Sequence, residues 1–293
     1  MDTKHIKTGV QQIMLGTVCK NEQQARETLR AIKSAGYDGI ELNGFMIRPS
    51  SMMVRLLTKF AGMPTGNGGK FNWKGLIDDA GLSVLSIHED LQGIKNDPAR
   101  IIKEAENFRC KTIVITGMYR FDYQDPDALS TLCRDLNDCG KILKDSGISL
   151  LYHNHNIELL NLRGAKPAGF DSTAYAYIVN HTDPEMLGFE LDSYWFTDGG
   201  ANVPAIMKLL GKRMRFWHIN DRGTKVSKLP MTPILKSDSM ELGYGNLDLD
   251  GLSEIALEND IEAVVLESHR NFAEGSPIRS LQLSAAYMKR FHS

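Results

Sequence analysis

The sequence predicts an α/β protein built as a single (β/α)8 barrel over residues 1–293. Three observations support this fold class. Eight short apolar runs alternate with amphipathic segments of helical period. Several of these segments begin at Asp, Ser or Asn and end at Gly, as helix termini require. No linker, low-complexity tract or short internal repeat divides the chain, so eight strand–helix units are expected to close one parallel sheet.

The elements follow from these patterns in chain order. Buried parallel strands read as short, nearly continuous apolar runs. We expect them at about 10–14, 38–42, 83–87, 111–115, 148–152, 187–192, 214–219 and 262–267. Helices are expected at about 21–36, 97–109, 125–147, 172–181, 203–211, 249–260 and 277–291. The competing open sheet with helices on both faces needs a Gly-rich first turn, which the segment MLGTVCKNE does not offer.

Composition limits the classes of function. With 42% hydrophobic residues and a formal net charge of −2, the chain can bury a large core but has no broad basic surface, which argues against nucleic acid as a partner. The amino-terminal segment lacks an apolar run long enough for a signal peptide or a membrane span. The four cysteines show no Cys-x-x-Cys spacing, and we expect free thiols in a reducing, cytoplasmic setting.

Two segments are longer than simple connections. Residues 43–71 follow the second strand and residues 222–247 follow the seventh. Long loops at the catalytic face of a barrel commonly act as lids or substrate walls, which is what we expect here. The alternative is that they form a contact in a homo-oligomer.

Metal-binding side chains stand at the ends of four successive strands. In the segment YHNHN, alternation places His153 and His155 on one side of a strand and Asn154 on the other. Asp192, His218 and Glu267 each end one of the next three strands. Imidazole and carboxylate ligands from adjacent strands suit one Mn²⁺, Mg²⁺, Co²⁺ or Zn²⁺ ion. An acid cluster held only by ion pairs is the alternative.

Further candidates surround this set. Glu41 and His88 end earlier strands and could face the pocket or orient a ligand. Trp195 could stack on a sugar ring or pack the barrel top. Asn154, Asp221 and His269 adjoin the ligand candidates and are predicted to contact substrate. The Gly243 and Gly245 turn could offer backbone N–H groups to an anion, although a tight loop accounts for it equally well.

At these residues the chain resembles the sugar phosphate isomerase/epimerase family, the xylose isomerase-like TIM barrels. The resemblance rests on YHNHNIEL, ELDSYW, the HIND segment in place of a common His-x-Lys-Asp, the turn from Gly243 to Asp248, and VVLES. In the first half, GYDGIEL and LSIH extend it.

The resemblance implies a barrel that holds one divalent metal between strands five and eight. Asp192, His218 and Glu267 would take ligand positions directly. On the fifth strand the ketose 3-epimerases carry a glutamate that also moves a proton, whereas this chain has His153 there, with His155 two residues on. A mechanism with two glutamates is therefore not expected, and either histidine could be the fifth-strand ligand.

Such a metal would stabilise an enediolate formed by loss of a proton next to a carbonyl. Glu267, His155 or Glu41 could be the base. Protonation of the enediolate on the neighbouring carbon gives isomerisation, protonation on the opposite face gives epimerisation, and loss of a β-oxygen gives dehydration or glycoside cleavage. We predict an isomerase or epimerase acting on a sugar or sugar derivative. A metal-dependent lyase acting on a keto-sugar, keto-glycoside or keto-inositol is the alternative.

Two other classes fit less well. A DNA-repair nuclease of the related endonuclease barrel type needs three zinc ions and a basic groove, and eight histidines supply too few ligands. A barrel that binds sugar without catalysis has no need of an intact metal set.

Overall fold

The predicted α/β barrel is confirmed. The computed structural model describes residues 5–49, 70–226 and 230–292. Eight parallel strands form a closed barrel in the order β1, β10, β7, β6, β5, β4, β3, β2. They are β1 (Lys7–Gln11), β2 (Gly39–Asn43), β3 (Ser83–Glu89), β4 (Thr112–Thr116), β5 (Ser149–His153), β6 (Leu187–Asp192), β7 (Met214–Ile219) and β10 (Ala263–Leu266).

The first strand lies three residues earlier than predicted. The strand expected at 10–14 is β1, Lys7–Gln11, and a 3-10 helix, η1 (Gln12–Leu15), follows it. The side chain of Gln11 accepts a hydrogen bond from the backbone N–H of Ile13 and so caps this helix. All of η1 is buried. Apolar character alone therefore does not mark the end of the strand.

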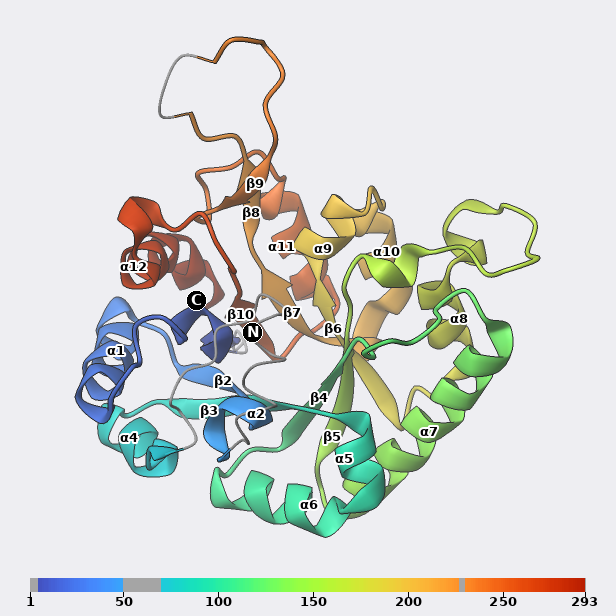
Figure 1. Ribbon diagram of the computed structural model, residues 1–293, viewed down its shortest axis with the longest axis horizontal. Helices are drawn as coiled ribbons and strands as arrows, with labels where there is room; N and C mark the ends of the chain where they lie inside the picture. Colours follow the sequence, from blue (N-terminus) through green and yellow to red (C-terminus); the bar gives the residue numbers. More distant parts are fainter. Residues whose placement is uncertain (1–4, 50–69, 227–229, 293) are drawn as a thin grey trace. The chain divides into compact units, whose positions relative to one another are not determined.

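The chain divides into two compact units, and the prediction of one domain over residues 1–293 stays a prediction. Unit 1 comprises residues 1–83, 218–253 and 263–293, and unit 2 comprises residues 84–217 and 254–262. In unit 1, β1 pairs with β2 and with β10. Helix α1 (Glu22–Ala35) packs against α4 (Trp73–Ala80) and α12 (Pro277–Met288) (Figure 1).

In unit 2, the strands β3 to β6 pair in chain order. Figure 1 shows the green helix α7 running outside β5, against which it packs. The buried strand residues and the apolar faces of the helices form the core between them. The helices of this unit are α5 (Leu91–Asn96), α6 (Pro98–Asn107), α7 (Pro126–Asp145), α8 (Ala174–His181), α9 (Ser193–Asp198) and α10 (Val203–Leu210). Helix α11 (Leu249–Glu258) runs from unit 1 into unit 2.

The segment 222–247, expected to be a loop, contains a small sheet instead. Strands β8 (Asp221–Gly223) and β9 (Asp238–Met240) pair in antiparallel fashion. Strands of three residues are too short for a pattern of alternation to reveal them. In the other long segment, 43–71, the structure shows α2 (Gly44–Ile47) at its start, while residues 50–69 lie outside the described residues.

All four cysteines are free, as their spacing predicts, and all four are buried. Burial raises the pKa of the Cys19, Cys133 and Cys139 thiols to about 11, so these groups stay protonated and unreactive near neutral pH. Among the helices that the structure describes, no helix is long and apolar enough to span a membrane.

Candidate active site

In unit 1, three predicted site residues form one buried cluster around His218. The Nε2 atom of His218 lies 2.6 Å from Oε1 of Glu41, and its Nδ1 atom lies 2.9 Å from Oε2 of Glu267. The side chains of His218 and Glu41 are 0% exposed, and that of Glu267 is 7% exposed. The ends of β2 and β7 and the residue after β10 supply these groups, so the structure brings together residues that lie far apart in the sequence.

The one imidazole and two carboxylates of this cluster are groups that can bind a metal ion. Two buried carboxylates beside one imidazole leave negative charge that a cation can offset, because buried charges need partners. The ligand atoms of His218 and Glu267 lie within 4.8 Å of one another. Metal-binding histidines usually donate their second N–H to a carboxylate, which fixes the ring. Glu41 is placed to accept that bond from His218 and so to orient it.

In unit 2, a matching arrangement surrounds His153. Its Nδ1 atom lies 3.1 Å from Oε2 of Glu190, and Nε2 of His88 lies 3.0 Å from the same oxygen. The rings of His88 and His153 meet edge to face at 5.4 Å. His88 and His153 thus share one fully buried carboxylate, that of Glu190. The expected role of His88 as a substrate contact stays a prediction.

Glu190 was missed by the sequence reasoning, which treated it as part of an apolar run. A signal was present, however. Glu190 and Asp192 are two residues apart on β6, and residues i and i+2 of a strand point to one face. The candidate ligand Asp192 therefore predicts that Glu190 lies on the same face.

Asp192 and Asn154 are joined to each other. The side-chain amide of Asn154 donates to the carbonyl of Asp192, and its oxygen accepts the N–H of Asp192 at 2.9 Å. Asn154 thus fastens the end of β5 to the end of β6, and its predicted contact with substrate stays a prediction. Asp192 uses Oδ1 to cap α9 through the N–H of Trp195. Ligand atoms of Asp192 and His153 lie within 4.8 Å of one another.

The strand β5 ends at His153, so His155 lies beyond it rather than on the same strand face as predicted. The two rings nevertheless meet edge to face at 5.1 Å. The ring of Trp195 lies 5.7 Å from that of His155. His155 therefore adjoins His153 although it lies outside the strand, and Trp195 adjoins His155.

A second residue that the sequence reasoning missed is Glu158, which holds His155 in place. This fully buried carboxylate accepts the backbone N–H of His155 at 3.0 Å and the hydroxyl of Tyr152 at 2.9 Å. Tyr152 lies 3.0 Å from the hydroxyl of Tyr123, which in turn accepts the N–H of Met118. A single carboxylate thus connects the loops that follow β4 and β5.

The connection is tight at Gly117. A Cβ atom there would lie 3.0 Å from Oε1 of Glu158 and 3.3 Å from Nδ1 of His155, so a larger residue would displace this network. Tyr152, on the face of β5 opposite to His153, is the sequence signal for a polar group at this depth, because a buried tyrosine hydroxyl needs a partner.

Burial raises the pKa of Glu158 to about 7, and this predicts a pH dependence of stability. A carboxyl whose pKa is higher in the folded than in the unfolded chain makes the free energy of unfolding fall as pH rises from about 4.5 to about 7. The difference in pKa corresponds to about 3 kcal/mol. We expect Glu158→Gln to remove this fall. Urea unfolding at several pH values from 4.5 to 8 measures it.

Glu185→Gln is the matched control, because it neutralises an exposed carboxylate that pairs with Lys144. It should leave the wild-type pH profile unchanged. A Glu158→Gln protein whose unfolding free energy keeps the wild-type pH dependence would show that Glu158 is ionised throughout this range.

The carboxylate of Asp221 accepts hydrogen bonds from the backbone of a turn in the same chain. Its Oδ2 atom accepts the N–H groups of Gly243 and Gly245, at 3.0 and 2.8 Å, and Oδ1 accepts that of Leu247. The anion bound by this Gly-rich turn is therefore a carboxylate of the chain, and the turn is the tight loop that the sequence allowed. A contact between Asp221 and substrate stays a prediction. His269 lies 3.5 Å from Glu267 and is 36% exposed, which keeps it available to a ligand.

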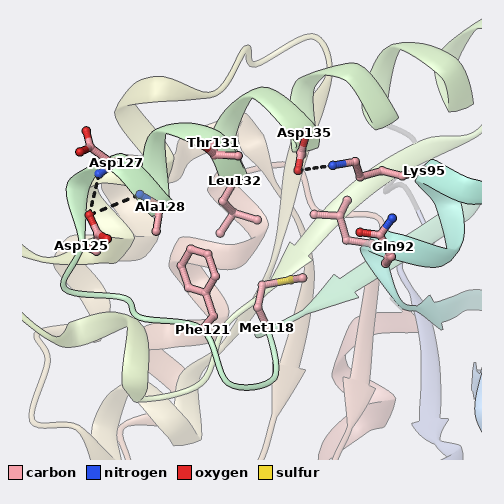
Figure 2. Close-up of a pocket in the computed structure, with 11 residues that line it drawn as sticks. Gln92, Lys95, Met118, Phe121, Asp125, Asp127, Ala128, Thr131, Leu132 and Asp135 are labelled. Atoms are coloured by element: carbon pink, nitrogen blue, oxygen red, sulfur yellow. Dashed lines mark hydrogen bonds and ion pairs between the residues drawn. The ribbon is translucent and has the colours of Figure 1, made fainter.

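A surface pocket of about 510 Å³ lies between α5 and the first half of α7. Figure 2 shows Met118, Phe121 and Leu132 on its walls and the ion pair of Lys95 with Asp135 at its edge. None of the predicted site residues lines it. The candidate active site is therefore defined by the strand-end residues and not by this pocket.

Comparison with known proteins agrees with the fold. The family model described as "xylose isomerase-like TIM barrel" matches residues 29–290. A curated relative, inosose dehydratase of Mesomycoplasma hyopneumoniae strain J, is 21% identical over 98% of this chain and 96% of its own length.

Solved structures show the same fold at low identity. A sugar phosphate isomerase/epimerase from Parabacteroides distasonis superposes with a TM-score of 0.73 at 21% identity, covering 100% of this chain and 97% of the other. The IOLI protein with a bound zinc atom superposes with a TM-score of 0.64 at 14% identity, covering 98% of this chain and 98% of its own. A xylose isomerase-like TIM barrel protein from Mycobacterium smegmatis in complex with magnesium superposes with a TM-score of 0.62 at 16% identity, covering 99% of this chain and 96% of its own. The match of the family model over most of the chain identifies this protein as a member of the xylose isomerase-like TIM barrel family.

Proposed function

We propose that this protein is a divalent-metal-dependent enzyme that removes a proton next to the carbonyl of a sugar or sugar derivative, by way of an enediolate. The observation that carries the proposal is the pair of buried histidine–carboxylate sets, one around His218 and one around His153. Isomerisation or epimerisation is the first outcome that we expect from this step.

The proposed ligands are His153, Asp192, His218 and Glu267. They follow or end β5, β6, β7 and β10, which are consecutive neighbours in the barrel order. Parallel strands present their carboxyl ends at one face of a barrel, which is why we place the four groups around one ion. Two imidazoles and two carboxylates suit Zn²⁺, Mn²⁺ or Co²⁺, and relatives in this fold hold zinc or magnesium. When bound, such an ion polarises a carbonyl and offsets the negative charge that develops on it.

The surrounding residues would orient the ligands, move the proton and contact the substrate. Glu41 and Glu190 would orient His218 and His153 by accepting a ring N–H from each. Of the three candidates for the base, His155 suits the role best, because Glu41 faces His218 and Glu267 is assigned to the metal. Trp195, beside His155, would pack on the sugar, and His88 and His269 would contact its hydroxyl groups.

Elimination of a β-oxygen is the second candidate outcome. It is favoured by the curated relative named inosose dehydratase, which matches this chain over nearly its whole length, and by the histidine at the position where ketose 3-epimerases carry a glutamate. A keto-inositol or keto-sugar with a leaving group on the β-carbon would then be the substrate.

Proton exchange tests the shared first step and separates the outcomes. The metal-loaded protein would be incubated in D₂O with a panel of keto-sugars and keto-inositols, and products would be followed by NMR. We expect deuterium at the carbon next to the carbonyl of at least one compound. A moved carbonyl marks an isomerase, an inverted centre an epimerase, and a lost hydroxyl a dehydratase.

The protein treated with a chelator is the control and should exchange no proton until metal is restored. Protein that retains its metal and yet exchanges no proton on any compound of the panel would contradict the proposal and favour a barrel that binds sugar without catalysis.

A further inference from the structure

A second group of metal-binding side chains lies in unit 1, away from the residues assigned to catalysis. His5 precedes β1, Asp38 precedes β2, and His292 lies in the 3-10 helix η7 (Lys289–His292) near the end of the chain. His5 and Asp38 lie just before the amino ends of β1 and β2, whereas Glu41 lies in β2 towards its carboxyl end and Glu267 follows the carboxyl end of β10. The backbone brings the segments together, since the N–H of Ile6 donates to the carbonyl of Phe291.

The three side chains converge on one oxygen atom. The Nε2 atom of His5 lies 3.2 Å from Oδ2 of Asp38, and Nε2 of His292 lies 3.3 Å from the same oxygen. The two imidazole rings stack with their centroids 5.0 Å apart. All three ligand atoms lie within 4.8 Å of one another.

These separations match the spacing of zinc ligands. Zinc binds nitrogen and oxygen at about 2.0–2.1 Å in tetrahedral geometry, and two ligands of a tetrahedron are then about 3.3 Å apart. Hydrogen bonds from nitrogen to oxygen are most often shorter, at about 2.9–3.0 Å. The distances of 3.2 and 3.3 Å are therefore close to two edges of a zinc tetrahedron, and the contact of His5 with Asp38 is a long hydrogen bond when no zinc is bound.

The surroundings suit a ligated carboxylate. The backbone N–H of Thr8 donates to Oδ2 of Asp38 at 2.9 Å, a contact of the kind that orients a ligating carboxylate from outside the coordination shell. The hydroxyl of Thr8 lies 2.8 Å from Nε2 of His292, and zinc bound at this nitrogen would replace that contact. The side chain of His5 is 49% exposed and that of His292 is 28% exposed, so solvent can supply a fourth ligand.

We propose that His5, Asp38 and His292 form a second, non-catalytic metal site that takes Zn²⁺. Two imidazoles and one carboxylate are a zinc ligand set, whereas Mg²⁺ prefers an octahedron of oxygen atoms. Bound zinc would cross-link residue 5 to residue 292 and stabilise the folded chain, because a ligand of the native state shifts the unfolding equilibrium. The site is independent of the function proposed above.

Equilibrium dialysis of the full chain against zinc, with zinc content measured by mass spectrometry, tests this site. The comparison is made in an Asp192→Asn background, which weakens the proposed catalytic site. We expect the protein that also carries His5→Gln and His292→Gln to bind about one zinc ion fewer per chain. Added zinc should raise its melting temperature less than that of the protein that keeps His5 and His292. Added Mg²⁺ should change the melting temperatures of the two proteins equally.

His181→Gln in the same background is the matched control, since His181 is a surface histidine that stacks on Tyr177 and takes no part in the cluster. It should leave the zinc content unchanged. Equal zinc content and an equal zinc-dependent rise in melting temperature with and without His5 and His292 would overturn the proposal. A difference between the two proteins that depends only on pH would overturn it as well and identify the cluster as an ion pair of protonated imidazole with Asp38.

Discussion

Replacing Asp192 by alanine should remove the proposed metal ion from the protein and lower turnover by about a thousandfold or more. A metal ion supplies several kcal/mol of stabilisation to a developing oxyanion, and each 1.4 kcal/mol corresponds to a factor of ten in rate. Glu267→Gln should act in the same way, because it removes the negative charge of a second proposed ligand. Metal content by mass spectrometry and proton exchange in D₂O measure the two effects.

Asp192→Asn separates loss of metal from loss of fold. The asparagine keeps a side-chain oxygen for the N–H of Trp195 and therefore preserves the cap of α9, whose loss costs about 1 kcal/mol. Thermal melting should show a smaller change for Asp192→Asn than for Asp192→Ala. Full metal occupancy in both Asp192→Asn and Glu267→Gln would refute the assignment of these ligands.

The second large effect is expected at His155. If this residue carries the proton, His155→Asn should keep the metal and lose about a hundredfold to ten-thousandfold in turnover, the usual contribution of a general base. His153→Asn, the neighbouring change, should instead lose the metal. The pair of variants separates a ligand from a proton carrier on the same stretch of chain, with metal content and proton exchange measured for each.

The reverse pattern, in which His155→Asn loses the metal and His153→Asn keeps it, would make His155 the ligand. Wild-type turnover in a His155→Asn protein that retains its metal would remove both roles. His181→Asn serves as the control for the general effect of replacing a histidine, because His181 lies on the exposed side of α8.

The fold was predictable because the alternation of strand and helix is a local pattern. Burial of both faces makes each barrel strand an apolar run, and the caps mark the helix ends. The errors arose where local patterns are weak. Most of β1 and all of the 3-10 helix η1 that follows it are buried, so the apolar character of the sequence does not show where the strand ends and the helix begins. The short strands β8 and β9 depend on each other for hydrogen bonds, which no local pattern records.

The candidate site was predictable in its strand-end residues but not in its partners. Reactive side chains at the carboxyl ends of strands identify themselves by type and position. The contacts of His218 with Glu41 and of His153 with Glu190 depend on which residues meet across strands, and the sequence carries no register for that. Glu158 was missed for a related reason, because its partners Tyr152 and Tyr123 lie 6 and 35 positions away.

The carboxylate of Asp221 has a consequence for how this protein can diversify. It accepts three backbone N–H groups from residues 243–247 and so holds the end of the long segment after β7 next to the start of that segment. A Cβ atom on Gly245 would collide with this carboxylate. Both ends of the intervening segment are thereby fixed close to the strand that carries His218. Doubling the length of a flexible loop costs only about 0.6 kcal/mol. Insertions and exchanges between Gly223 and Asp238 are therefore expected to leave β7 and His218 in place, which makes this segment a suitable position for engineered changes of length.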